Sequence, residues 1–196
     1  RHVLEFPIPS MGISMRIFRI AVTALLPLVV IACAKTTETD AELVARAGAP
    51  LFKGMGEYSR TITTTDPGAQ RYFNQGMVMG FGFNHAEAVR SFRAAQKLDP
   101  DCAMCFWGEA LVTGPNINVT AKGKAVMSPD EQVAAWAALE KAKAAAANKP
   151  DVERDLIEAL SKRYSPTPVE NRDSFDSAWA EALGARAVLV LIGERP

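Results

Sequence analysis

The stretches AQRYFNQGMVMG (69–80) and AMCFWGEALVTG (103–114) share one pattern and lie 34 residues apart in the sequence. At this offset aromatic residues align with aromatic ones and small residues with small ones: Tyr72 with Phe106, Phe73 with Trp107, and Gly76 with Ala110. An internal period of about 34 residues is the spacing of helix–turn–helix repeats. The sequence therefore predicts an all-α fold in which antiparallel helical hairpins stack as a short solenoid.

The first unit also has an ordered set of small and large residues. These are Tyr72, Gly76 and Met79 on the first helix, Ala88, Phe92 and Ala95 on the second, and Pro100 after it. Their order and spacing resemble a tetratricopeptide (TPR) repeat, with Tyr72 in place of the usual tryptophan and Met79 in place of the usual tyrosine. Gly76 and Ala88 would let the two backbones approach closely, and Phe92 would fill the space between them. Phe106 and Ala110 are the corresponding packing residues of the second unit.

The later units are less regular than the first. A loop over 115–127 is inserted before Ser128, where Ser128, Pro129 and Glu131 have the pattern of a capping box at a helix start. The first helix of a third unit is expected from Asp151 to about Arg163, with Val152, Leu156, Ile157 and Leu160 on one side. The last helix is expected from near Arg172. The helical repeat domain is thus predicted to cover 56–183, with an irregular end over 184–196 that indicates truncation or a frame shift.

The segments GEYSRTITTTDPGAQRYFNQG (56–76) and FGFNHAEAVRSFRAAQKLDPDCAMCFWGEALVTGPNIN (81–118) resemble the opening of a family of bacterial TPR lipoproteins, most of them uncharacterised. The resemblance implies a TPR fold and a location in the cell envelope. It supplies no catalytic residues, so it predicts a scaffold and does not name the ligand.

The amino-terminal residues have the pattern of an export signal. A basic start at Met15 is followed by an apolar stretch of thirteen residues, Ile20–Ala32, which is shorter than the roughly 20 residues that span a bilayer. Residues 15–32 therefore indicate a cleaved signal peptide. The tetrapeptide ending at Cys33 resembles a bacterial lipobox, which predicts lipidation of Cys33; an ordinary signal peptide with an incidental cysteine is the alternative. Residues 1–14 are interpreted as upstream sequence, and 33–55 as a lipidated cysteine with a flexible tether.

Cys102 and Cys105 form the one motif with reactive potential in the mature chain. Attachment of a c-type haem needs a histidine after the second cysteine, and Phe106 stands there. A structural disulfide or an inert pair is expected, away from the core, with metal capture or thiol redox as alternatives. Asp101 is the expected helix cap, which would place both sulfurs in the first helical turn. Helix neighbours there have Cβ atoms about 5–6 Å apart, wider than a disulfide prefers, so the bond should be strained and easily reduced.

Composition excludes few functions. The chain has 196 residues, 48% of them apolar, and a formal net charge of zero, which gives no footprint for nucleic acid. No arrangement of nucleophile, base and metal ligands is apparent, so we expect no enzyme activity, no cofactor and no metal site. The sequence predicts an exported scaffold, anchored by lipid in the envelope on the periplasmic or outer-membrane face, that binds a protein or peptide partner in its groove. The alternative is an envelope thiol-redox or metal-handling protein that uses Cys102 and Cys105.

Overall fold

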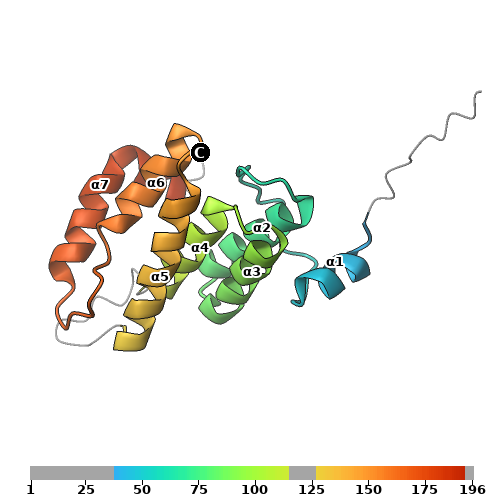
Figure 1. The fold of residues 1–196 in the computed structure, drawn as a ribbon, viewed down its shortest axis with the longest axis horizontal. Helices are drawn as coiled ribbons and strands as arrows, with labels where there is room; N and C mark the ends of the chain where they lie inside the picture. The colour runs from blue at the N-terminus through green and yellow to red at the C-terminus, as the bar shows by residue number, and fades with distance from the viewer. Residues whose placement is uncertain (1–37, 115–126, 193–196) are drawn as a thin grey trace, which may run out of the picture. The chain divides into compact units, whose positions relative to one another are not determined.

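The computed structural model of the chain describes residues 38–114 and 127–192, and side chains as far as Gly184. Within these ranges the regular structure is entirely helical, which confirms the all-α prediction (Figure 1). All the helices belong to one compact unit that begins at Thr37. Their bounds are α1 Asp40–Ala47, α2 Pro67–Phe81, α3 His85–Leu98, α4 Ala103–Thr113, α5 Pro129–Ala145, α6 Asp151–Ser161 and α7 Asp173–Ile192. The signal peptide over 15–32, Cys33 and the loop over 115–126 lie outside the described residues.

Six of the helices pack as three consecutive hairpins. α2 packs on α3, α4 on α5, and α6 on α7. Between hairpins, α3 contacts α4 and α5 contacts α6, while the first helices α2, α4 and α6 also contact one another in that order. α1 precedes this array and packs on α3.

Local capping interactions set the starts of α2 and α5. Asp66 caps α2, where its Oδ1 accepts hydrogen bonds from the N–H groups of Gly68 at 2.7 Å and Ala69 at 3.3 Å, and Pro67 occupies the first helical position. The capping box predicted for α5 is present between Ser128 and Glu131. The start predicted for α5 is therefore confirmed.

The core between the first two hairpins is built around Phe92 of α3. A Cβ added at Gly76 of α2 would lie 2.8 Å from the Phe92 ring, and one added at Gly108 of α4 would lie 2.3 Å from it. The ring also meets Phe73 edge-on, with the ring centres 5.7 Å apart. Phe92 thus fills the space inside its own hairpin and also packs against the next one.

The predicted packing residues differ in how deeply they are buried. Tyr72, Gly76, Ala88, Phe92, Ala95 and Ala110 are all buried. Met79 and Phe106 are only partly buried, and the neighbouring Trp107 takes the deep position in α4. The Lys141 ammonium lies 5.8 Å from the Phe106 ring centre, so this ring reaches the surface of α4 and α5. Pro100 is exposed, in the turn after α3.

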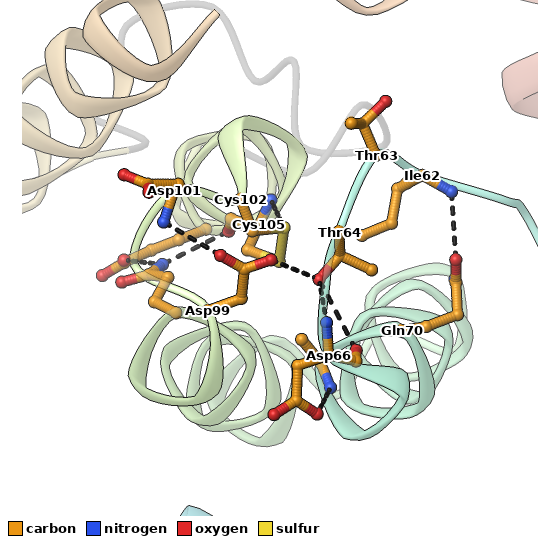
Figure 2. The surroundings of a disulfide bond; sticks show 12 residues. Ile62, Thr63, Thr64, Asp66, Gln70, Asp99, Asp101, Cys102 and Cys105 are labelled. Carbon is orange, nitrogen blue, oxygen red and sulfur yellow. Dashed lines mark hydrogen bonds between the residues drawn. A yellow bond between two sulfur atoms is a disulfide. The ribbon is translucent and has the colours of Figure 1, made fainter. Parts of the chain in front are cut away.

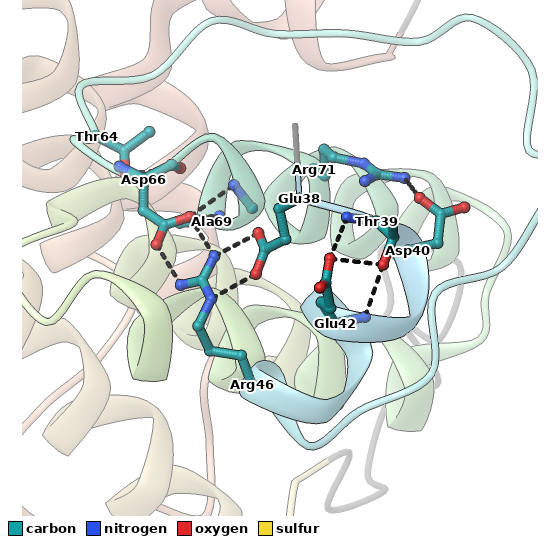
Figure 3. A network of polar contacts seen from close by, with 10 residues as sticks. Glu38, Thr39, Asp40, Glu42, Arg46, Thr64, Asp66, Ala69 and Arg71 are labelled. Atoms are coloured by element: carbon teal, nitrogen blue, oxygen red, sulfur yellow. Dashed lines mark hydrogen bonds and ion pairs between the residues drawn. The ribbon is translucent and has the colours of Figure 1, made fainter. Parts of the chain in front are cut away.

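The tether expected over 33–55 is wrong from Thr39 onward, because this part of the chain is folded. Thr39 and Glu42 form a capping box at the start of α1, and Leu43 and Ala47 are buried in the common core. Figure 3 shows how the helix is tied down: Arg46 contacts both Glu38 and the capping carboxylate of Asp66. The Arg46 hydrogen bond is also the main reason why the pKa of Asp66 lies below its usual value.

Two further expectations need correction. Val152, expected on the inner side of α6 with Leu156, Ile157 and Leu160, is exposed, whereas the other three are buried. The end expected to be irregular from Gly184 is helical as far as Ile192, and only Gly184 departs from helical geometry, with φ 57°. A positive φ is a conformation that glycine adopts without steric cost, so the break in the pattern at this residue is a break in the helix.

Candidate functional site

The segment between α1 and α2, residues 50–65, has neither helix nor strand. We call it the strap. After α1 the strap first lies beside the middle of α2, and it then runs back to the first turn of α2. Along this path its main chain is bound by side chains of α2, α6 and the turn between α3 and α4. The polar groups that bind it form the candidate site.

The first contact is made by Gln75 of α2. Its Oε1 accepts a hydrogen bond from the Phe52 N–H at 2.8 Å, and its Nε2 donates to the Pro50 carbonyl at 3.0 Å. The same Nε2 donates to Ser91 Oγ of α3 at 3.0 Å, which fixes the orientation of the carboxamide. Gln75 is itself buried, so it binds the start of the strap through a donor and an acceptor that are already held in place.

Two further carboxamides, those of Gln70 and Asn74, hold the returning part of the strap. Gln70 Oε1 accepts from the Ile62 N–H at 3.0 Å, and Gln70 Nε2 donates to the Arg60 carbonyl at 2.8 Å. Asn74, one turn further along α2, accepts from the Arg60 N–H at 3.3 Å and is bridged to Gln70 by a 3.0 Å hydrogen bond. Residues at i and i+4 share one face of a helix, so this pair binds the main chain of Arg60 and of Ile62, two residues apart in the strap.

Two buried carboxylates complete the site at the end of the strap. Glu153, in the first turn of α6, accepts from the Thr63 N–H at 2.6 Å. Asp99 accepts from the Thr65 N–H at 2.9 Å and from the Thr64 hydroxyl at 2.5 Å, as Figure 2 shows for Thr64. Hydrogen bonds to ionised acceptors are about twice as strong as neutral ones, so this end is the more tightly held.

The electrostatics of Asp99 follow from these contacts. Asp99 is only 6% exposed, and burial alone would raise the pKa of its carboxyl group. The hydrogen bonds from Thr64, Thr65 and the Asp101 N–H favour the ionised form and outweigh burial, so the pKa of Asp99 lies below its usual value. Asp99 is thus held as a carboxylate while it binds the strap.

Glu153 is less well satisfied than Asp99. It is 5% exposed, its Oε1 accepts from Thr63, and its Oε2 is buried without a hydrogen-bond partner among the described residues. A buried acceptor left without a partner costs roughly 1–3 kcal/mol. This carboxylate can therefore accept one more donor than the strap provides.

Cys102 and Cys105 lie beside the Asp99 contact and are joined by a disulfide (Figure 2). The expected cap was wrong: Cys102, not Asp101, caps α4 and has extended geometry, with φ −76° and ψ 92°. The pair is therefore not a pair of helix neighbours, and its Cα atoms, 5.3 Å apart, meet the ordinary spacing of a disulfide. The expected position away from the core was also wrong, because both cysteines are fully buried.

Two other ring side chains lie away from the strap. His85 starts α3, and its Nδ1 lies 2.7 Å from the Val112 carbonyl near the end of α4. Trp107 is buried and donates from Nε1 to the Leu156 carbonyl at 3.1 Å, so it joins α4 to α6. Across the described ranges, no three residues of the types that bind metals come together as a possible metal site. No helix in these ranges is long and apolar enough to span a membrane.

Sequence reasoning missed the groups that bind the strap. None of Gln70, Asn74, Gln75, Asp99 and Glu153 is among the residues singled out from the sequence. A signal was present for the α2 residues, because Gln70 and Asn74 recur at i and i+4 next to the threonine-rich end of the strap. No family model matches the chain, and neither curated proteins nor solved structures yield a significant match.

Proposed function

We propose that this chain is a TPR scaffold of the bacterial cell envelope, exported by its signal peptide and anchored through Cys33, that binds a protein or peptide partner on the face formed by its first helices. One observation supports this most directly. The face of α2, together with Glu153 and Asp99, already holds a non-helical stretch of polypeptide by its main chain. Stacked helical hairpins present extended surfaces of this kind, and their activity is binding.

The aromatic residues at the carboxyl end of α2, where Tyr58 of the strap lies, mark where a partner would make contact. Phe81, the last residue of α2, is 46% exposed and meets Tyr58 of the strap edge-on, with the ring centres 6.3 Å apart. Phe83, just beyond, is also exposed. Aromatic side chains are enriched where proteins bind other proteins, so this end of α2 is where a cross-linking probe should be placed.

The experiment uses the full chain with a photoreactive phenylalanine analogue in place of Phe81, irradiated in intact envelope. A matched probe replaces Val133, which is 51% exposed and lies on α5, outside the first helices α2, α4 and α6. We expect a discrete cross-linked species from position 81 that is absent from position 133. Cross-links from both positions alike, or from neither, would refute a partner on this face.

A further inference from the structure

The strap is held mainly through its main chain. Five of its N–H groups and two of its carbonyls bond to side chains of the helical scaffold: the N–H groups of Phe52, Arg60, Ile62, Thr63 and Thr65, and the carbonyls of Pro50 and Arg60. Main-chain groups are the same in every polypeptide. The site is therefore chemically able to bind a segment of different sequence in the same place.

Fewer contacts come from the side chains of the strap: the Thr64 and Thr65 hydroxyls donate to Asp99, Ser59 Oγ accepts from Asn74, and Tyr58 meets Phe81. Ile62 is the one buried side chain between Leu51 and Thr65, and Thr61, Thr63 and Thr65 are exposed. The strap turns at Gly54 and Gly56, both with positive φ near 75° and with no atom near the position of a Cβ. These glycines have free space around them, so the returning limb, residues 59–65, can leave α2 with the loss of its hydrogen bonds to the scaffold and of one buried side chain, Ile62.

The strap also leaves part of the site unused. Glu153 Oε2 is buried and has no partner among the described residues, although Oε1 of the same carboxylate binds the Thr63 N–H. The Thr63 side chain is exposed and makes no hydrogen bond to Glu153 within the described part of the chain. A segment with a hydroxyl or amino group directed to this carboxylate would satisfy it better.

We propose that the strap is an internal occupant of the partner site, and that a partner binds by replacing the limb 59–65 with a non-helical polypeptide segment. That segment is recognised by its main chain at Gln70, Asn74 and Asp99, and it carries a donor side chain opposite Glu153. This proposal rests on the proposed function. The proposal adds the class of ligand, a non-helical polypeptide segment. It also means that, without a partner, the strap itself blocks the site.

The magnitude of self-inhibition can be tested without knowing the natural partner. An internal segment competes at an effective concentration of the order of millimolar, so a free segment binds only in proportion to the fraction of open sites. The probe is a fluorescein-labelled peptide with the sequence of residues 57–66, EYSRTITTTD, capped at both ends. Binding to the full chain is measured by fluorescence anisotropy.

The variant that opens the site must change the strap and leave the helices intact. Thr63→Pro removes the N–H that Glu153 accepts, whereas the side chain that it replaces is exposed. Thr61→Pro is the matched control, because Thr61 is equally exposed and its N–H makes no hydrogen bond within the described residues. We expect Thr63→Pro to bind the probe at least about tenfold tighter than the wild type. Thr61→Pro should stay within about twofold of it.

A second pair of variants locates the probe. In the Thr63→Pro background, Glu153→Ala should weaken the probe about tenfold, whereas Arg90→Ala on the exposed face of α3 should not. Thr65→Pro, which removes the N–H that Asp99 accepts, provides an independent opened form should Thr63→Pro fold poorly by circular dichroism. Equal probe binding by the wild type and both opened variants would overturn the proposal. The photo-cross-linking experiment at Phe81 could still succeed in that case, so the two failures are distinguishable.

Discussion

Phe92 shows how one side chain can fix the spacing of two hairpins. Its ring occupies the space that a Cβ would fill at Gly76 in its own hairpin and at Gly108 in the next one. A glycine inside a helix ordinarily costs about 1 kcal/mol relative to alanine, so two glycines against one ring indicate a packing requirement.

We therefore expect Gly108→Ala to destabilise the chain, against the normal helix preference. The added methyl group would lie 2.3 Å from the Phe92 ring, and overpacking of this kind costs about 1–3 kcal/mol. Urea unfolding followed by circular dichroism measures the change. The double variant Gly108→Ala/Phe92→Leu should recover part of the loss. A Gly108→Ala variant as stable as the wild type would show that α3 and α4 are not packed this closely.

Asp99 is the residue through which pH should act on the strap. Its pKa is lowered in the folded chain because hydrogen bonds from Thr64 and Thr65 outweigh burial. The unfolded chain then binds the proton more strongly, so the stability contributed by this carboxylate is present above the unfolded pKa of about 3.9 and is lost as pH falls through the lowered folded value. Asp99→Asn should therefore be about 1–2 kcal/mol less stable than the wild type near neutral pH.

The difference between Asp99→Asn and the wild type should shrink as pH falls toward about 3. Urea unfolding of both proteins across this range gives the comparison. Asp101→Asn is the control, because Asp101 is exposed and only its N–H bonds to Asp99. A constant difference between Asp99→Asn and the wild type at every pH would show that the Asp99 charge does not hold the strap.

At the scale of elements, the turn between α3 and α4 joins the disulfide to the Asp99 contact. The Cys102 N–H donates to the Asp99 carbonyl at 3.1 Å, and both sulfur-bearing residues are fully buried. Thiol–disulfide exchange requires a thiolate to reach a sulfur atom, so burial protects the bond whatever its intrinsic potential. This argues against the easy reduction expected from the sequence.

We predict that the disulfide resists mild reductant in the folded chain and is reduced readily in urea. Mass spectrometry after alkylation of the intact protein should find a deficit of two hydrogens that survives reductant under native conditions and disappears when the chain is unfolded. Fast reduction in the native state would instead favour the thiol-redox alternative. Two free thiols in freshly isolated protein would contradict the disulfide itself.

The helix starts could be read from the sequence because the chemistry of capping is local. In Asp66-Pro67 and in Ser128-Pro129, two adjacent residues are enough to indicate the capping residue and the first residue of the helix. The site could not be read in this way, because Glu153 and the Thr63 that it binds are 90 residues apart in the sequence. Only the stacking of α6 beside α4 brings them together.

The helix α1 was missed for a different reason. Its polar sequence suggested a tether, although Thr39 and Glu42 have the spacing of a capping box and Leu43 and Ala47 are an apolar pair at i and i+4. The hydrophobic signal in a helix of eight residues is short, and packing on α3 supplies what local propensity does not.

Leu43→Ala separates a docked helix from a tether. Leu43 is fully buried, and its Cδ1 lies 2.4 Å from the position of a Cβ at Gly68. Removing a buried leucine side chain costs about 2–5 kcal/mol. We expect thermal or urea unfolding of the Leu43→Ala variant to show a loss in this range, and Ala45→Ser on the exposed side of α1 to show little change. A Leu43→Ala variant as stable as the wild type would show that this segment is a flexible tether and not a docked helix.

For the whole molecule, the fold of α1 constrains any lipid anchor at Cys33. Only five residues, 34–38, separate Cys33 from the cap of α1. A chain spans at most about 3.3–3.6 Å per residue, so α1 could lie no more than on the order of 20 Å from the modified cysteine. In an anchored protein the start of α1 would therefore lie within this distance of the lipid-modified cysteine.

We predict that the chain takes up labelled fatty acid and partitions into detergent, because several acyl chains hold a protein on a bilayer to which a single chain holds it only weakly. Cys33→Ser should abolish both the labelling and the partitioning. A fluorophore on Ala45→Cys, on the exposed side of α1, should then be quenched by lipids that carry a nitroxide at the headgroup. The same fluorophore in the Cys33→Ser background is the control and should remain unquenched. Fatty-acid labelling that survives Cys33→Ser would refute the anchor. Labelling at Cys33 without quenching at position 45 would show that the link over 34–38 holds α1 away from the headgroups, contrary to this prediction.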